Sequence, residues 1–162
     1  MIPQLIDIEQ APWCVLPPGV HTATLAEVKS VFAQNHHRRK LFLGLLNAAN
    51  ALHVAGCKYL YLDGSYVTAK PNPSDFDCCW NPEGVKISLL DPVFLDFSNA
   101  RQNQKNKFLG ELFPFNFDAA PGKKFLDFFQ VEKYSGGQKG IIVIDLTTES
   151  FTQLEEGFHD LY

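Results

Sequence analysis

Residues 62–79, LDGSYVTAKPNPSDFDCC, contain two aspartates that are separated by one residue and follow a Gly-Ser pair. Side chains alternate between the two faces of a strand, so Asp75 and Asp77 would point the same way, about 7 Å apart along the strand. Two carboxylates at this range repel each other, and a divalent cation compensates both charges. Mg²⁺ prefers oxygen ligands and is commonly held by one or two carboxylates together with substrate phosphates. The spacing therefore predicts a site for one or two Mg²⁺ ions at Asp75 and Asp77.

The Gly-Ser pair supplies groups that bind phosphate. Gly64 allows the backbone to approach an anion closely, and Ser65 offers a hydroxyl and an N–H. A helical turn that begins there would add its own N–H groups. Lys70 is a candidate phosphate ligand, although a solvated loop lysine is the alternative. The segment therefore combines phosphate donors with metal ligands, as phosphoryl-type transfer between two metal ions requires.

This combination resembles the signature of the nucleotidyltransferase superfamily, whose members have the polymerase-β-like fold. The signature is a Gly-Ser turn, a short spacer and an Asp-x-Asp strand, often with a serine before the first aspartate, which Ser74 matches. Outside it, FLDFFQ at residues 125–130 and GGQKGIIVIDL at 136–146 resemble an uncharacterised bacterial family of minimal nucleotidyltransferase-like proteins. The resemblance implies a sheet flanked by helices, and the transfer of a nucleoside monophosphate, AMP by default, from a triphosphate bound with Mg²⁺.

Carried over residue by residue, the resemblance implies that Gly64 and Ser65 contact the triphosphate, and Lys70 is a further nucleotide-binding candidate. Asp75 and Asp77 would hold the metal and belong to the catalytic group. The superfamily usually adds a third carboxylate on a later strand, which helps to activate the attacking hydroxyl.

Asp118 is our first candidate for this third catalytic carboxylate, because it ends the next extended run. The sequence also departs from the superfamily pattern, since Tyr66 and Val67 stand where a basic residue often follows Gly-Ser. Three other carboxylates are alternatives for the third position: Asp96, Glu111 and Asp145.

Two functions from different classes are compatible with these residues. The first is an enzyme that moves a nucleoside monophosphate to a hydroxyl of a protein or an RNA. The second is a catalytically weak or inactive protein of the same fold, which acts as an antitoxin-like partner of a toxin. The net charge of −4 and the small size suit the second function. The metal motif favours the first.

The composition is that of a globular protein. The chain has 162 residues, of which 46% are hydrophobic and 14 are phenylalanine, so one domain with a sizeable core is expected. The net charge of −4 gives no strong basic field for nucleic acid. We expect no signal peptide and no membrane segment, and hence a cytoplasmic protein whose cysteines are reduced. These cysteines are Cys14, Cys57, Cys78 and Cys79, predicted as buried small side chains.

The hydrophobic pattern predicts a single α/β (α+β) domain over residues 1–162, with a mixed sheet flanked by helices. Thr24 and Glu27 form a capping box for the first helix, and Gly56 ends the second. Helices are predicted over residues 25–35, 37–55 and 91–108, strands over 57–63, 75–80, 110–118 and 141–146, and a short helix or extended run over 122–133.

Three segments carry weaker predictions. Residues 1–21 are Pro-rich and predicted as an irregular surface arm. Residues 150–162 are predicted as a polar tail or a short helix. The run HHRRK at 36–40 is predicted as a solvated charge cluster, with contacts to nucleic-acid phosphates as the alternative.

Overall fold

A five-stranded mixed sheet organises the computed structural model, which describes residues 1–155 and Phe158. The strand order is β1-β7-β2-β3-β4, so the last strand of the chain lies inside the sheet. Strands β1 and β7 are parallel, as are β3 and β4, while β2 is antiparallel to both of its neighbours. The predicted α/β class is confirmed. The strands are β1 Gly19–Thr22, β2 Tyr59–Asp63, β3 Phe76–Trp80, β4 Gly110–Pro114 and β7 Gly140–Asp145.

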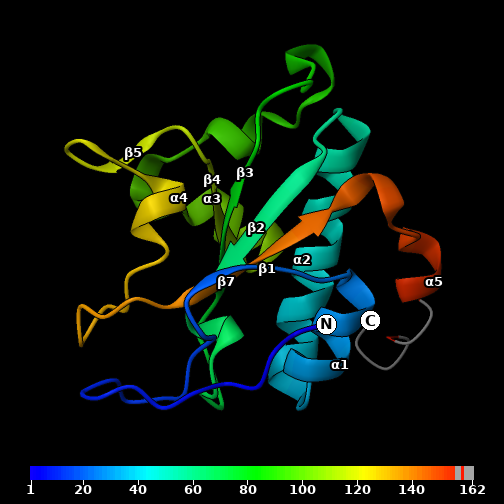
Figure 1. Ribbon diagram of the computed structural model, residues 1–162. Helices are drawn as coiled ribbons and strands as arrows, with labels where there is room; N and C mark the ends of the chain where they lie inside the picture. Colours follow the sequence, from blue (N-terminus) through cyan, green and yellow to red (C-terminus); the bar gives the residue numbers. More distant parts are fainter. Residues whose placement is uncertain (156–157, 159–162) are drawn as a thin grey trace.

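The first face of the sheet carries the main hydrophobic core. Helices α1 (Leu25–Phe32) and α2 (His36–Val54) cover this face (Figure 1), and α3 (Ser98–Phe108) packs against α2. Alternate strand positions are fully buried against the helices, as the period of two requires. These positions are Leu60, Leu62, Phe76, Cys78, Trp80, Leu112, Ile142 and Ile144.

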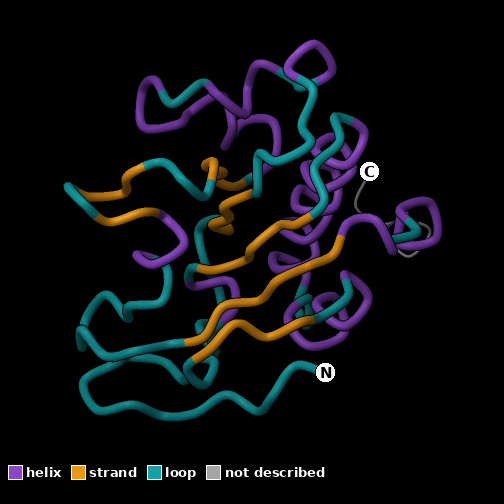
Figure 2. Tube along the Cα trace, turned by 45° about the horizontal axis from the view of Figure 1, so that its top comes forward, coloured by secondary structure: helices purple, strands orange, loops and turns teal. Residues whose placement is uncertain are grey.

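The second face is only partly covered. A smaller cluster around Cys79, Phe129 and Ile141 joins the middle of the sheet to α4 (Phe125–Phe128). A two-stranded hairpin, β5 (Asp118–Ala120) and β6 (Lys123–Lys124), leads into α4 on the same side (Figures 1 and 2).

The helix boundaries follow local capping rules. The Thr24 hydroxyl accepts a hydrogen bond of 3.1 Å from the N–H of Glu27, as the predicted capping box requires. Helix α2 ends before Gly56, whose φ of 101° suits the residue that follows a helix. The predicted positions of the first two helices are confirmed.

The predicted single helix over residues 91–108 is wrong, because it is two elements. Asp91 caps a 3₁₀ turn, Pro92–Leu95, by accepting a 3.0 Å hydrogen bond from the N–H of Val93. Helix α3 then begins with Asn99, Ala100 and Arg101 at φ values of 51°, 55° and 61°. A left-handed conformation costs an L-residue about 1–2 kcal/mol, so tertiary contacts must hold this turn.

The N-terminal segment is more ordered than predicted, and the C-terminal segment contains the short helix that was one of its two predicted forms. The arm over residues 1–21 is irregular at first, but its end pairs with β7 as edge strand β1. After β7, helix α5 (Phe151–Glu155) confirms the short helix, and Phe158 is fully buried with its ring 5.6 Å from that of Phe42. The rest of the predicted tail, residues 156–157 and 159–162, lies outside the described residues. In the part of the chain that the structure describes, no helix is long and apolar enough to cross a membrane.

Candidate metal centre

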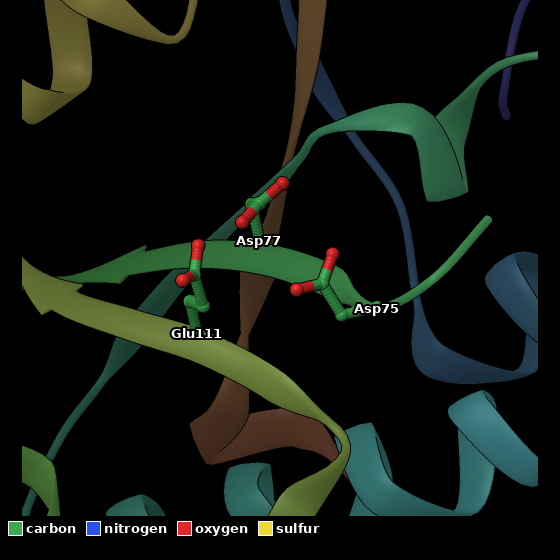
Figure 3. Close-up of side chains that lie close together, drawn as sticks. All are labelled: Asp75, Asp77 and Glu111. Atoms are coloured by element: carbon green, nitrogen blue, oxygen red, sulfur yellow. The ribbon is translucent and has the colours of Figure 1, made fainter. Parts of the chain in front are cut away.

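Three carboxylates meet on the second face of the sheet. Asp75 directly precedes β3, Asp77 lies on β3, and Glu111 lies opposite Asp77 on the parallel strand β4. One carboxylate oxygen from each lies within 4.8 Å of the other two. Figure 3 shows the three side chains standing on the same side of the two strands. An all-oxygen donor set of this size fits Mg²⁺ or Mn²⁺, so the predicted pair Asp75 and Asp77 could hold a metal ion together with Glu111.

The structure does not bring Asp118, our first candidate for the third carboxylate, to Asp75 and Asp77. Asp118 lies on β5, where its exposed carboxylate pairs with Lys124 at 2.7 Å. Two of the alternatives also have other contacts: Asp96 accepts from the N–H of Ser98, and Asp145 accepts from that of Thr147. The parallel pairing of β3 with β4 brings Glu111 to the site, and the chain after Pro114 leaves the sheet.

The pKa of Asp77 is raised well above its usual range. Burial is the largest cause, and the charge of Asp75 and the hydrogen bond with Glu111 act in the same direction. Burial also acts to raise the pKa of Glu111, but hydrogen bonds from Asp77, Arg101 and Lys105 outweigh it, so that pKa is lowered. Of the two carboxyl groups, Asp77 therefore keeps its proton to the higher pH, and in that form it donates a hydrogen bond to the Glu111 carboxylate.

The pKa of Asp75 is raised as well. Burial is the largest cause and the charge of Glu111 adds to it, while Lys105, Arg101 and Lys70 act against the shift. Ionising all three carboxylates together is thus unfavourable without a cation among them. A divalent ion would supply that compensation.

The raised pKa of Asp77 predicts that the metal-free protein loses stability as the pH rises. The contribution of protonated Asp77 to the free energy of unfolding is fully present when the pH is below the pKa of an aspartate in the unfolded chain. It falls between that pKa and the raised pKa of the folded state, by up to about 1.4 kcal/mol per pH unit for one proton. Urea denaturation across this pH range, with EDTA present, measures the effect. In Asp77→Asn the decline should shrink, whereas an equal decline in wild type and variant would exclude Asp77 as its source.

Gly64 has a backbone conformation that other residues rarely adopt, and it lies beside the Asp77 carboxylate of the candidate metal centre. Its φ is 79° and its ψ is −171°, a combination found essentially only in glycine. A Cβ atom at this position would lie 2.2 Å from Oδ2 of Asp77. The glycine thus leaves the space that the Asp77 carboxylate occupies.

We therefore expect Gly64→Ala to destabilise the protein by about 1–3 kcal/mol from backbone strain alone, and also to displace the Asp77 carboxylate and weaken Mg²⁺ binding. Thermal denaturation and calorimetric titration with Mg²⁺ measure the two effects. Gly122→Ala is the matched control, because Gly122 has a φ of 73° with nothing within 4 Å of the added Cβ. Equal Mg²⁺ affinity in the two variants would contradict the account.

The loop between Gly64 and Asp75 is fastened by side chains from the start of α2. The buried guanidinium of Arg38 donates to the carbonyls of Tyr66 at 2.7 Å and Thr68 at 2.9 Å. It also donates to the carbonyls of Phe32 and Lys70. The prediction of a solvated charge cluster at residues 36–40 is therefore wrong for Arg38.

Two neighbours of Arg38 fasten the same loop nearer its end. The Asn35 amide donates to the carbonyl of Pro71 at 2.9 Å, and Nε2 of His37 contacts the carbonyl of Pro73 at 2.5 Å. The start of α2 is therefore a scaffold for the loop.

One cavity of about 840 Å³ contains the predicted site residues except Asp118. The three carboxylates line it together with the predicted phosphate ligands. Its size suits a small-molecule ligand. The predicted residues that line it are Gly64, Ser65, Lys70, Ser74, Asp75, Asp77 and Glu111.

Residues 10–145 match a model described as a family of unknown function (DUF6932). The chain belongs to this family. The matched range contains the three carboxylates, the Gly-Ser turn and every strand of the main sheet. No curated protein and no solved structure matches the chain. The family model therefore covers both the sheet and the candidate site, and it assigns no activity to them.

Sequence reasoning missed a buried ion pair beside the three carboxylates of the candidate metal centre. Lys139 donates to Asp63 at 2.6 Å, and both side chains are at least nine-tenths buried while lining the cavity. Asp63 lies opposite Asp77 in the pairing of β2 with β3. Burial raises the pKa of Asp63, and Lys139 acts against the shift. The signal in the sequence was an aspartate directly before Gly-Ser, at the end of a strand.

Arg101 was also missed, although it contacts a member of the centre. Its Nε and one terminal nitrogen donate to Oε1 of Glu111 at 3.1 and 2.8 Å, and Lys105 lies 3.2 Å from the same oxygen. The left-handed turn over residues 99–101 places the guanidinium there. A run of polar residues gives no sign of such a turn, so spacing could not have found it.

Proposed function

We propose that this protein is a metal-dependent nucleotidyltransferase. It moves a nucleoside monophosphate, by default AMP, from a triphosphate to a hydroxyl of a protein or an RNA. One observation carries the proposal: Asp75, Asp77 and Glu111 have carboxylate oxygens within 4.8 Å of one another, in the cavity that Gly64 and Ser65 also line. The resemblance of the Gly-Ser and Asp-x-Asp motif to nucleotidyltransferases supports it.

The three carboxylates would hold Mg²⁺, which when bound neutralises charge on the phosphates and favours ionisation of the attacking hydroxyl. Gly64 and Ser65 would donate to the triphosphate, and Gly64 keeps the backbone close to Asp77. Lys70 lies near enough to Asp75 to act on its pKa, so its charge reaches the same part of the cavity. The protein thus contributes mainly by positioning and by electrostatics.

Glu111 completes the centre from the neighbouring strand. Its lowered pKa keeps it ionised at neutral pH, and Arg101 and Lys105 fix the position of its carboxylate. It is therefore the residue of this chain that takes the place of the third carboxylate. Glu111, and not Asp118, would then help to activate the attacking hydroxyl.

Calorimetric titration of ATP, GTP, CTP and UTP, each with and without Mg²⁺, tests the proposal. We expect Mg²⁺-dependent binding of at least one triphosphate. Exchange of labelled pyrophosphate into the bound triphosphate, or label transfer to protein or RNA, would then identify the reaction. If no triphosphate binds in Mg²⁺, the proposal is wrong, and the antitoxin-like binding role becomes the better account of the fold.

A further inference from the structure

A layer of aromatic rings begins directly beside the metal centre. Glu111 and Phe113 are two residues apart on β4, so they share a face of the sheet about 7 Å apart. The Arg101 guanidinium bonded to Glu111 also lies 5.7 Å from the ring centre of Phe113. The Phe113 ring stacks on Phe125 of α4 at 4.0 Å, with an angle of 9° between the planes. The layer therefore runs without a break from the carboxylates to α4.

The outer part of this layer is exposed to the cavity. Trp13, Phe128 and Tyr134 line the cavity and are 41%, 45% and 66% exposed. They come from the N-terminal arm, from α4 and from the loop before β7, segments that lie on the same side of the sheet (Figures 1 and 2). Together with Phe125, these three residues form what we call the aromatic wall. Large rings are usually buried, so their convergence on one cavity suggests a ligand with an apolar, planar part.

Positive charge accompanies the rings. Lys123 and Lys133 also line the cavity, and Nζ of Lys133 lies 5.5 Å from the ring centre of Tyr134. Aromatic faces beside cationic groups bind nucleotides, because the rings stack on bases while the cations attract phosphates. The carboxylates at the other end of the cavity would hold the metal bound to those phosphates.

We infer that the aromatic wall stacks on the base of a purine nucleoside triphosphate whose phosphates lie at the carboxylate centre. This inference rests on the proposed function and specifies the base of the donor triphosphate. Stacking favours purines because their larger rings bury more apolar area.

The side chains that line the cavity also limit how well it can distinguish one base from another. Among the described residues, no Asn or Gln side chain lines the cavity, and these amides are the groups that make paired hydrogen bonds to N6 and N7 of adenine. The Glu132 carboxylate is engaged by the N–H groups of Tyr134 and Ser135. Stacking without such pairing separates purines from pyrimidines but hardly distinguishes adenine from guanine, so GTP should serve as well as ATP.

The test compares Mg²⁺-dependent binding of ATP, GTP, UTP and inorganic tripolyphosphate to the wild type and to the double variant Phe128→Ala, Tyr134→Ala. Tripolyphosphate has the phosphates without the base. Phe117→Ala is the matched control, because Phe117 is also 45% exposed but is not one of the residues that line the cavity. Quenching of Trp13 fluorescence is a second readout, since the other tryptophan, Trp80, is buried in the main core.

In the wild type we expect ATP and GTP to bind within about threefold of each other and several-fold more tightly than UTP. In the double variant ATP and GTP should lose about tenfold or more in affinity, with tripolyphosphate and the Phe117→Ala variant unchanged. Unchanged ATP affinity in the double variant, an equal loss for tripolyphosphate, or UTP binding as tight as ATP would overturn the inference. If no triphosphate binds to the wild type in Mg²⁺, the proposed function itself fails, whether or not tripolyphosphate binds.

Discussion

Asp77→Asn is expected to abolish Mg²⁺-dependent binding of triphosphate while the protein stays folded. Asparagine has the same shape and can still donate to Glu111, as the protonated Asp77 does, but it binds Mg²⁺ far more weakly than a carboxylate. Loss of an outer partner of a metal ligand typically costs 10- to 100-fold in affinity, and we expect loss of the ligand itself to cost about 100-fold or more. Calorimetry with Mg²⁺ and ATP measures it.

The same variant should be at least as stable as the wild type without metal. Burial and the charge of Asp75 raise the pKa of Asp77 and so favour its protonated form, and asparagine imitates that form at every pH. Groups that serve a site often cost stability in this way. Asp118→Asn is the control for both measurements, because Asp118 is exposed on β5 and pairs with Lys124. An Asp77→Asn variant that binds Mg²⁺ and ATP like the wild type would contradict the account.

Arg38→Met is expected to destabilise the protein by about 3–5 kcal/mol. Removal of the guanidinium leaves the buried carbonyls of Tyr66 and Thr68 without their donor, and each unsatisfied group costs about 1–3 kcal/mol. The contact of Arg38 with the Tyr66 ring, at 5.2 Å, is lost as well. Because the loop that carries Ser65 and leads to Asp75 is held by these bonds, nucleotide binding should weaken in any molecules that remain folded.

Urea denaturation of Arg38→Met beside Lys40→Met measures this effect, since Lys40 is an exposed residue of the same helix. Arg38→Lys should recover only part of the stability, because an ammonium group cannot reproduce the planar fork that reaches several carbonyls. Equal stability of the Arg38→Met and Lys40→Met variants would show that the loop is held by other contacts.

The part of the site that lies close together in the sequence could be predicted from it. Asp75 and Asp77 share a face because of the strand period, and Gly64 precedes them in a turn that needs a positive φ. The first two helices, α1 and α2, were also predictable, since capping residues and hydrophobic spacing are local signals. These features depend on neighbours along the chain and not on the order of the strands.

The third carboxylate depends on tertiary pairing, and spacing alone could not select it. Glu111 and Asp118 both lie in the run that was predicted as one extended segment, but only Glu111 lies on β4, in register with Asp77. The chain then turns at Pro114 and forms a separate hairpin that carries Asp118 away. A prediction of the sheet order would have been needed to choose between them.

The side chains that hold the site in place also depend on tertiary contacts, so they could not be predicted from the sequence. Arg38 belongs to a run of charged residues that is typical of a solvated surface, yet its guanidinium is buried against a loop about 30 residues later in the chain. Lys139 meets Asp63 across a separation of 76 residues. Whether a charged side chain is buried depends on partners that are distant in the sequence, and these partners cannot be identified from a single sequence.

The central claim is that Asp75, Asp77 and Glu111 form a metal centre. Its most direct test is the binding of Mn²⁺, a paramagnetic ion that takes the same oxygen ligands as Mg²⁺, followed by electron paramagnetic resonance in the wild type, Glu111→Gln and Asp118→Asn. We expect wild type and Asp118→Asn to bind Mn²⁺ equally, and Glu111→Gln, which lacks a ligand, to bind it about 100-fold or more weakly, beyond the loss typical of an outer partner. Equal binding by wild type and Glu111→Gln, or a loss in Asp118→Asn alone, would contradict the account.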